Sequence, residues 1–285
     1  MPLCSLCVYA ASPTATANQN NSYTAQLQQL EQHHHGHLGI AAINTATNRK
    51  ILFNEDRRFP FCSTGKVMVV ADILKKSESQ PQLLQQKIHY TTQDIKSSGY
   101  APITAKYVTN GMTVAELAQA AIDYSDNGAM NQLLKLADGP QNITRFARTL
   151  NDDKFNLVRS EPQLNSAIPG DIRDTTTPAA MAASLQKLVL ESSLMLPQQQ
   201  LLQQWLKGNT TGDKRIRAGV PQGWIVGDKT GTGDYGTTND IAVIWPPHAK
   251  PIVIVIYFTQ DKKDAKPQDE VIAKASKIVI NEITR

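Results

Sequence analysis

The hexapeptide FCSTGK at residues 61–66 is the stretch around which the rest of this chain is organised. The apolar residues behind it, Val67, Val70, Ala71 and Leu74, recur with the period of an amphipathic helix. We therefore expect Ser63 to open a helix and Lys66 to lie one turn later on the same face. A serine hydroxyl is a weak nucleophile until a neighbouring base accepts its proton, so this pair is a candidate nucleophile and base.

The Ser-x-x-Lys spacing alone is a weak signal, because the chain contains a second copy at Ser184 and Lys187. That copy lies in a helix-like stretch, where we expect it on the surface. Only the neighbouring motifs can therefore show which of the two copies is the catalytic pair.

Composition indicates an ordinary globular protein. Of the 285 residues, 41% are hydrophobic and 19% are charged, which is enough for one large domain or two lobes. The net charge of +4 comes from scattered Lys and Arg, and no nucleic-acid-binding motif is present, so we expect no nucleic-acid partner.

The N-terminal segment differs from the rest because its first charged residue is Glu31. Residues 3–11 are short and apolar, and residues 15–17 (Ala-Thr-Ala) have the form of a signal-peptidase site. We predict a signal peptide at residues 1–17 and export to the periplasm; without a basic residue near Met1, the signal is atypical or the start is displaced. No apolar run reaches 18 residues, so no membrane anchor is expected.

Two of the three cysteines, Cys4 and Cys7, lie within the predicted signal peptide. The third, Cys62, then has no partner for an intramolecular disulfide. The mature fold must depend on its hydrophobic core.

Strand-like runs occur at both ends of the chain. Residues 38–46 and 51–54 are short apolar runs separated by a turn signal, which predicts a hairpin. Three further runs come late, at residues 224–230, 241–245 and 252–259, and the last is so rich in β-branched residues that it should be buried on both faces.

Helical patterns fill most of the rest. We expect helices at residues 23–32, 112–120, 127–137, 143–150, 178–190 and 268–283. The predicted fold class is α/β (α+β): one five-stranded antiparallel sheet with terminal helices, from residues 18–57 and 217–285, beside an all-helical lobe of residues 58–216. Ligands prefer the seam between two such lobes.

Four histidines lie close together between His33 and His37. They suggest a metal site, but no carboxylate or cysteine accompanies them at a ligand spacing. Histidines also suit the negative end of a helix dipole. We therefore expect a solvated helix end, with neither a metal nor another cofactor.

Three more stretches are candidates for the seam. Ser125 and Asn127 offer a hydroxyl and a carboxamide just before a helix, although Asp126 between them is also a typical helix N-cap. Residues 228–233 (DKTGTG) end a strand and offer a cation, two hydroxyls and glycines, or simply a turn. Residues 159–174 have little regular pattern, which is typical of a functional loop.

Ser-x-x-Lys, Ser-Asp-Asn and Lys-Thr-Gly in this order are the motif set of class A β-lactamases and penicillin-binding proteins. The chain resembles a class A serine β-lactamase of the extended-spectrum cefotaximase (CTX-M-like) group. The resemblance runs from about Tyr23 to Ile283 and includes four further blocks: EPQLN at 161–165, NSAIPGDIRDTT at 165–176, GNTTG at 208–212 and GDKTGTGDYGTTND at 227–240.

The resemblance implies a two-lobe serine β-lactamase/transpeptidase-like fold and assigns catalytic roles. Ser63 would attack the β-lactam carbonyl, and Lys66 or Glu161 would remove its proton. Ser125 would relay a proton to the leaving nitrogen, next to the positive charge of Lys229.

It also assigns binding roles. Glu161 and Asn165 would position and deprotonate the water that cleaves the acyl-enzyme. The backbone N–H groups of Ser63 and Thr232 would form an oxyanion hole, and Arg159 with Asp174 would close the base of the loop or form a mere surface pair. The implied substrate contacts are Asn127 for the amide side chain, Lys229, Thr230, Gly231 and Thr232 around the carboxylate, and Tyr100 as an aromatic wall or ordinary loop packing.

Several positions depart from the resemblance. Residues 264–268 lack an arginine that close cefotaximases carry, and Arg215 either compensates for it or is a solvated charge.

Gly233 stands where carbapenemase relatives have a cysteine that pairs with the one before the nucleophile, so carbapenem hydrolysis is not suggested. Thr232 replaces a more usual serine, and Asp234 leaves the range of cephalosporins open.

Three other functions compete with a monomeric β-lactamase acting on small-molecule β-lactams with a catalytic water. A penicillin-binding peptidase normally lacks the Glu161 loop. A β-lactam sensor module is tethered to a membrane helix, which this sequence does not predict. Metal-dependent hydrolysis requires a ligand pattern that we do not find.

Overall fold

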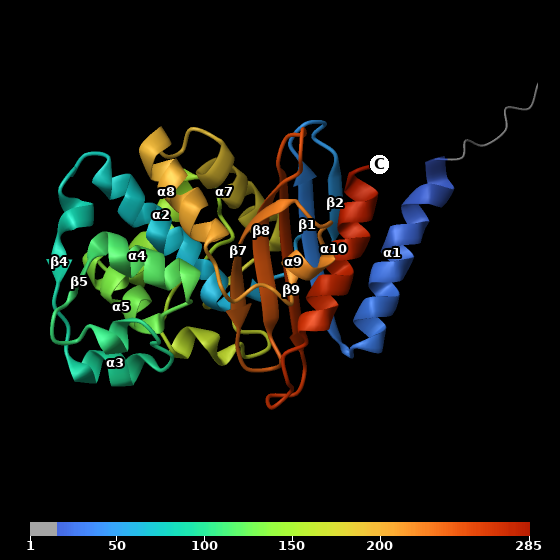
Figure 1. Ribbon diagram of the computed structural model, residues 1–285. Coiled ribbons are helices and arrows are strands. Elements are labelled where there is room, and N and C mark those ends of the chain that lie inside the picture. Colours follow the sequence, from blue (N-terminus) through green and yellow to red (C-terminus); the bar gives the residue numbers. More distant parts are fainter. Residues whose placement is uncertain (1–15) are drawn as a thin grey trace, which may run out of the picture.

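The computed structural model describes residues 16–285, with side chains from Tyr23 onward. Helices gather on one side of a central sheet, and the two terminal helices cover its other side (Figure 1). The predicted signal peptide, with Cys4 and Cys7, lies outside the described residues, except that Thr16 and Ala17 already belong to the first helix. Within residues 16–285, no helix is long and apolar enough to cross a membrane.

The central sheet joins the two ends of the chain, as predicted. Its antiparallel strands run in the order β2-β1-β9-β8-β7. Their bounds are β1 Gly36–Asn44, β2 Lys50–Phe53, β7 Ile225–Thr232, β8 Thr238–Trp245 and β9 Ile252–Gln260. The predicted hairpin is β1 and β2, and β1 pairs directly with β9, so that Ala41 lies opposite Val255.

Both faces of the sheet are buried, as the β-branched sequence of β9 predicted. Val253, Val255 and Tyr257 pack against the helices of the middle of the chain. Ile254 and Ile256 point the other way, towards α1 (Thr16–His33) and α10 (Asp269–Ile283). This alternation follows from the two-residue period of a strand.

The middle of the chain is helical, as expected. The helices are α2 Lys66–Ser77, α3 Thr92–Ser98, α4 Val114–Asp123, α5 Asn127–Leu136, α6 Pro140–Thr149, α7 Pro178–Leu190, α8 Leu196–Lys207 and α9 Ile216–Gly219. Shorter pieces are η1 Cys62–Gly65, η2 Leu83–Gln85, η3 Thr104–Lys106 and η4 Gln163–Ser166, with two-residue ladders β3 Phe59–Pro60 with β6 Thr175–Thr176 and β4 Lys87–Ile88 with β5 Met112–Thr113.

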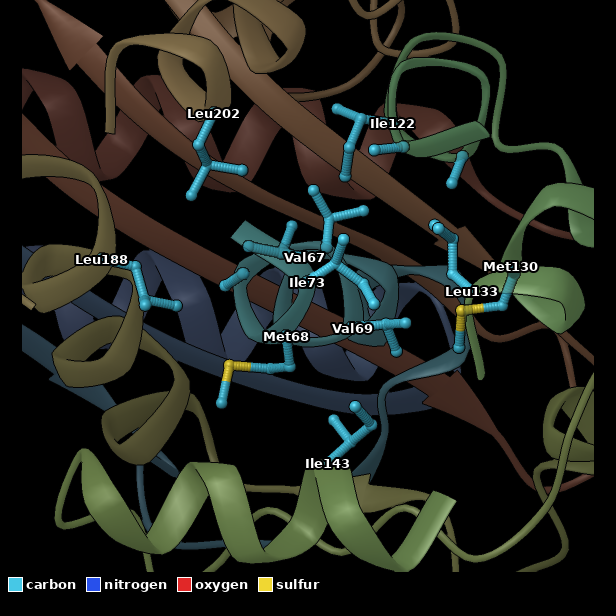
Figure 2. Close-up of a cluster of buried hydrophobic side chains, with 14 of the residues drawn as sticks. Val67, Met68, Val69, Ile73, Ile122, Met130, Leu133, Ile143, Leu188 and Leu202 are labelled. Carbon is cyan, nitrogen blue, oxygen red and sulfur yellow. The ribbon is translucent and has the colours of Figure 1, made fainter. Parts of the chain in front are cut away.

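Helix α2 is the centre of this lobe. Figure 2 shows it surrounded by side chains from other helices, including Ile122, Leu133, Ile143 and Leu188. Every residue from Lys66 to Leu74 is buried, so α2 is enclosed on all sides and not only along the amphipathic face that its spacing suggested. A helix buried in this way has little freedom to move, which fixes the residues at its first turn.

The start of α2 differs from the expectation in one respect. Ser63 does not open the α-helix but lies in the 3₁₀ turn η1, and α2 begins at Lys66. Cys62 before it has a φ of +50°, a left-handed conformation that is uncommon for a side chain of this kind. The serine is therefore presented on a tight turn.

Candidate active site

The Ser63 hydroxyl is in direct contact with the lysine one turn later. Lys66 Nζ donates to Ser63 Oγ at 2.9 Å, and also to Asn127 Oδ1 at 2.7 Å and to the backbone oxygen of Ser125 at 2.8 Å. The Lys66 side chain is fully buried. A buried amine needs such partners, because water no longer solvates it.

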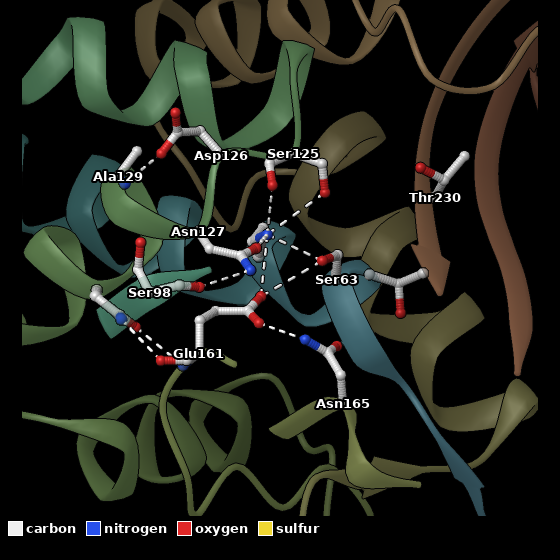
Figure 3. A network of polar contacts seen from close by, with 12 residues as sticks. Ser63, Ser98, Ser125, Asp126, Asn127, Ala129, Glu161, Asn165 and Thr230 are labelled. Atoms are coloured by element: carbon white, nitrogen blue, oxygen red, sulfur yellow. Dashed lines mark hydrogen bonds and ion pairs between the residues drawn. The ribbon is translucent and has the colours of Figure 1, made fainter. Parts of the chain in front are cut away.

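A carboxylate completes the cluster from the loop after α6. Glu161 Oε1 lies 3.0 Å from Lys66 Nζ and accepts from Ser63 Oγ at 3.4 Å. Its second oxygen, Oε2, accepts from Asn165 Nδ2 at 2.5 Å. Figure 3 shows Ser63, Ser125, Asn127 and Glu161 directed towards one another, with Asn165 facing the Glu161 carboxylate.

The backbone of Glu161 is held in place by a residue that no sequence motif indicated. Asn131, on α5, donates from Nδ2 to the Glu161 backbone oxygen at 2.9 Å. Its Oδ1 accepts from the Glu161 N–H at 3.0 Å. Nothing in the sequence distinguishes Asn131 from any polar residue on an amphipathic helix, so only the fold identifies it.

The loop that carries Glu161 is closed at its base by the expected ion pair between Arg159 and Asp174. Asp174 is fully buried and also accepts from the backbone N–H of Val158 at 2.8 Å and of Arg159 at 3.0 Å. The pair is therefore part of the loop's framework and not a mere surface bridge.

The turn between α4 and α5 brings Ser125 and Asn127 to the site. Asp126 caps α5, as its alternative interpretation proposed, by accepting from the Ala129 N–H at 2.8 Å. Ser125 has a φ of +57°, again left-handed. Its backbone oxygen thereby faces Lys66, and its hydroxyl faces the neighbouring strand.

Lys229 reaches the same turn from β7. Its Nζ donates to Ser125 Oγ at 2.9 Å and to the Thr230 backbone oxygen at 2.9 Å. Burial lowers the pKa of Lys229 well below its usual value, and the positive charge of Lys66 lowers it further. The nearby carboxyls of Asp228 and Asp240 oppose this decrease only in part.

Gly231 permits β7 to approach the nucleophile. A Cβ at this position would lie 2.7 Å from the backbone oxygen of Phe61, closer than two such atoms can come. Gly233 makes a similar approach, because a Cβ there would lie 2.7 Å from Cys62 Sγ. Cys62 is a free, buried thiol whose pKa is raised by burial, and no cysteine stands at 233 to pair with it.

Arg215 is not a solvated charge. It is only 7% exposed, and its Nε donates to Asp269 Oδ1 at 2.7 Å. Its Nη1 donates to the backbone oxygens of Gly231 at 2.8 Å and Asn239 at 2.7 Å, and its Nη2 donates to Thr232 Oγ1 at 2.8 Å. The guanidinium therefore stabilises the end of β7 through hydrogen bonds to Gly231 and Thr232.

These groups surround a cavity of about 340 Å³ between the sheet and the helices. Eight of the predicted residues line it: Ser63, Tyr100, Ser125, Asn127, Asn165, Arg215, Thr230 and Thr232. Lys66, Glu161, Lys229 and Gly231 do not line it but lie directly behind its wall. Thr211 also lines the cavity, although its place in the GNTTG block implied no role for it.

Two other expectations were wrong. Ser184 is buried, not on the surface, and its hydroxyl donates to Asp152 Oδ2 at 2.9 Å inside the helical lobe. His34 is also buried, not solvated, and contacts Gln268, the residue just before α10. Among the described residues, no group of His, Cys, Asp and Glu is arranged to hold a metal ion.

Comparison with solved structures identifies the fold. A β-lactamase from Desulfarculus baarsii superposes with a TM-score of 0.91 at 47% sequence identity, covering 93% of this chain and 98% of that one. The helical lobe, the five-stranded sheet and the cavity between them thus form the two-lobe serine β-lactamase fold.

Sequence comparisons define the family. The model of the β-lactamase enzyme family matches residues 22–283. A β-lactamase from Proteus vulgaris is 51% identical over 98% of this chain and 93% of its own length, and β-lactamase CTX-M-97 from Escherichia coli is 53% identical over 92% and 89%. The chain belongs to the β-lactamase enzyme family and is a class A, CTX-M-like member of it.

Proposed function

We propose that this protein hydrolyses the amide bond of β-lactam antibiotics, both penicillins and cephalosporins, through an acyl-enzyme on Ser63, and thereby confers β-lactam resistance. The observation that carries the proposal is the contact of one serine hydroxyl with both a buried amine and a buried carboxylate. A nucleophile beside its base is the requirement for covalent catalysis.

In the first step, Ser63 Oγ bonds to the β-lactam carbonyl carbon and the ring C–N bond breaks. Either Lys66 or Glu161 takes the serine proton, since both lie within reach of Oγ. Ser125 delivers a proton to the ring nitrogen, a role supported by its contacts with Lys66 and Lys229.

The oxyanion that forms on the carbonyl needs donors already in place. We assign this role to the backbone N–H groups of Ser63 and Thr232, which the close approach of Gly231 to Phe61 brings towards each other. In other hydrolases, one such donor contributes about 3 kcal/mol to the transition state.

In the second step, water attacks the ester carbon, and Glu161 accepts the water's proton. Asn165 orients this carboxylate through its contact with Oε2, and Asn131 holds the Glu161 backbone from the other side. Release of Ser63 completes the cycle without a metal or a cofactor. Deacylation is the step that separates a β-lactamase from an acylated sensor or peptidase.

Substrate binding follows from the rest of the cavity. Thr230, Thr232 and Arg215 in the cavity wall, with Gly231 and Lys229 behind it, suit the substrate carboxylate because they combine hydroxyls with positive charge. Asn127 faces the position of the amide side chain. Tyr100 stands at the mouth with 59% of its surface exposed, which suits an aromatic wall that a ligand covers.

The substrate range, the cellular location, the oligomeric state and the lobe boundaries are also proposals. Similarity to CTX-M enzymes supports oxyimino-cephalosporins as substrates. The uncharged, apolar start of the chain supports export to the periplasm, and we expect a monomer. The run of helices α2 to α8 between the strands of the two chain ends supports lobes at 18–57 with 217–285 and at 58–216, with the site at their seam.

Steady-state hydrolysis of a chromogenic cephalosporin by the purified mature protein tests the function. We expect sustained turnover that a metal chelator leaves unchanged. A single stoichiometric burst followed by no turnover would instead indicate a sensor or a peptidase. Turnover abolished by the chelator would contradict the serine mechanism.

A further inference from the structure

The segment GNTTG at residues 208–212 belongs to the resemblance to β-lactamases, but the mechanism above gives it no role. It follows α8 and runs beside β7, where Thr211 lines the cavity. Thr211 Oγ1 lies 2.5 Å from Thr230 Oγ1, and among the described residues it is the only hydrogen-bond partner of that hydroxyl. The direction of this hydrogen bond decides what Thr230 offers to a ligand.

The direction is set by Asn209, a buried residue whose amide has a single possible orientation. Its Oδ1 accepts from the Thr211 backbone N–H at 3.1 Å, and a backbone N–H can only donate. Its Nδ2 donates to Asp228 Oδ2 at 2.6 Å, and the other oxygen of Asp228 lies 2.6 Å from Arg217 Nε. Both contacts place the amide oxygen next to Thr211.

The hydroxyl proton of Thr211 is therefore already used. Thr211 Oγ1 lies 2.8 Å from Asn209 Oδ1, which has no proton to give, so the threonine donates. A hydroxyl has one proton. In the contact between Thr211 and Thr230, the donor must then be Thr230, and Thr230 Oγ1 presents only lone pairs to the cavity.

Thr232, on the other side of Gly231, is in the opposite state. Arg215 Nη2 donates to Thr232 Oγ1, which occupies a lone pair and leaves the hydroxyl proton free to turn towards the cavity. The two threonines thus differ in polarity although their side chains are identical. One offers a donor to a ligand, and the other offers an acceptor.

We propose that Thr211 is a specificity-determining residue that holds the hydroxyl proton of Thr230 in the free enzyme. The inference rests on the proposed function, in which the substrate carboxylate binds at Thr230 and Thr232. A carboxylate accepts but does not donate, so it must draw the Thr230 proton away from Thr211 before Thr230 can bind it. A ligand group that donates a hydrogen bond, such as an amide N–H, meets Thr230 without this exchange.

The variant Thr211→Val tests the proposal because it keeps the shape of the side chain and removes the competing acceptor. We expect the KM for a carboxylate-bearing penicillin or cephalosporin to fall about 3- to 10-fold, the equivalent of one neutral hydrogen bond. The kcat should stay within about twofold, because a KM effect alone reflects binding. The KM for the primary carboxamide of the same compound, whose N–H group can donate to Thr230, should not fall.

Two variants serve as controls. Thr211→Ser keeps the hydroxyl and should restore the KM of the unmodified enzyme. Thr210→Val removes the neighbouring hydroxyl, which donates to the Asp123 backbone oxygen at 2.9 Å and does not line the cavity, so it should leave the KM for the acid unchanged.

A KM for the acid that stays constant or rises in Thr211→Val would overturn the proposal, and so would an equal fall for acid and carboxamide. Failure of the proposed function would look different: the unmodified enzyme would not turn over the acid, or would bind acid and carboxamide equally. Neutron diffraction of the ligand-free enzyme decides independently of turnover. We expect the proton between the two threonines on Thr230 Oγ1, and its presence on Thr211 Oγ1 would refute the proposal.

Discussion

Lys66 shows how much of this site depends on single residues. Its side chain has no exposed surface, and three of its hydrogen-bond partners, together with Glu161, lie within 3.0 Å. Removing one partner from a buried charge leaves it uncompensated, which is far more costly than removing an exposed pair. The site is therefore a cooperative cluster in which Lys66 contacts Ser63, Ser125, Asn127 and Glu161.

Lys229 gives the site a testable dependence on pH. Its ammonium exists below its pKa, which burial places well below the usual lysine value of 10.5. Above that pKa the positive charge is lost, so kcat/KM for a carboxylate-bearing β-lactam should fall as pH rises, well before pH 10.5. Measuring kcat/KM as a function of pH tests this decrease, the alkaline limb of the profile.

Lys229→Arg is the informative comparison, because a guanidinium stays charged at any accessible pH. The alkaline limb should then move to higher pH, even if the rate itself is reduced. Lys274→Arg, on the exposed face of α10, should leave the profile unchanged. An alkaline limb that stays in place in Lys229→Arg would show that another group is responsible for it.

At the scale of residues, the sequence predicted the site residues that belong to recognisable motifs. Ser63, Lys66, Ser125, Asn127 and Lys229 are brought together as their spacing and order suggested. Asn131 and Thr211 could not be found in this way, because their contacts are with residues distant in the sequence. Asn131 binds the backbone of Glu161, and Thr211 binds the hydroxyl of Thr230. Ser184 shows the converse, since its spacing copies the motif while its partner Asp152 makes it structural.

At the scale of elements, β7 and η1 act as one unit. The absence of a Cβ at Gly231 lets the strand approach the turn that carries Ser63. Gly231→Ala should push these elements apart, lower the free energy of unfolding by about 1–3 kcal/mol as overpacking does, and reduce kcat/KM strongly. Urea denaturation and steady-state kinetics measure the two effects.

Gly223→Ala provides a control for backbone strain alone. Gly223 has a φ of +87°, and a Cβ there would meet no atom within 4 Å. It should lose about 1–2 kcal/mol of stability, because alanine disfavours that conformation, while kcat/KM is unchanged. Equal kinetic effects in the two variants would contradict the steric account of Gly231.

Elements with a long apolar pattern were predictable, and short ones were not. The five strands of the sheet and helices α4, α5, α6, α7 and α10 lie close to their expected ranges. The two-residue ladders and η1 are too short to show a periodic sequence pattern. Tertiary contacts, which the sequence does not reveal, determine where they form. Helix α8, rich in glutamine, was missed although Leu202 and Trp205 are buried.

At the scale of the whole molecule, the sheet joins two cores. One face packs on α7 and α8, and the other on α1 and α10. Because β9 contributes alternate residues to both, neither core can unfold while the other keeps an intact sheet. The helical lobe and the sheet therefore share one core.

This shared sheet predicts a single unfolding transition. Leu188→Ala in the helical core and Ile254→Ala in the terminal-helix core should each lower the free energy of unfolding by about 2–5 kcal/mol. Both variants should still unfold in one transition that is the same by circular dichroism and tryptophan fluorescence. Two separated transitions in either variant would show that the lobes unfold independently.

The central claim is that Ser63 becomes acylated and that Glu161 serves the release of the acyl group. Intact mass spectrometry of Glu161→Ala mixed with a penicillin tests it most directly, with Ser63→Ala and Ser184→Ala as controls. We predict a persistent adduct of one penicillin on Ser63 in Glu161→Ala, no adduct in Ser63→Ala and normal turnover in Ser184→Ala. Rapid turnover by Glu161→Ala, or an adduct on a residue other than Ser63, would contradict the account.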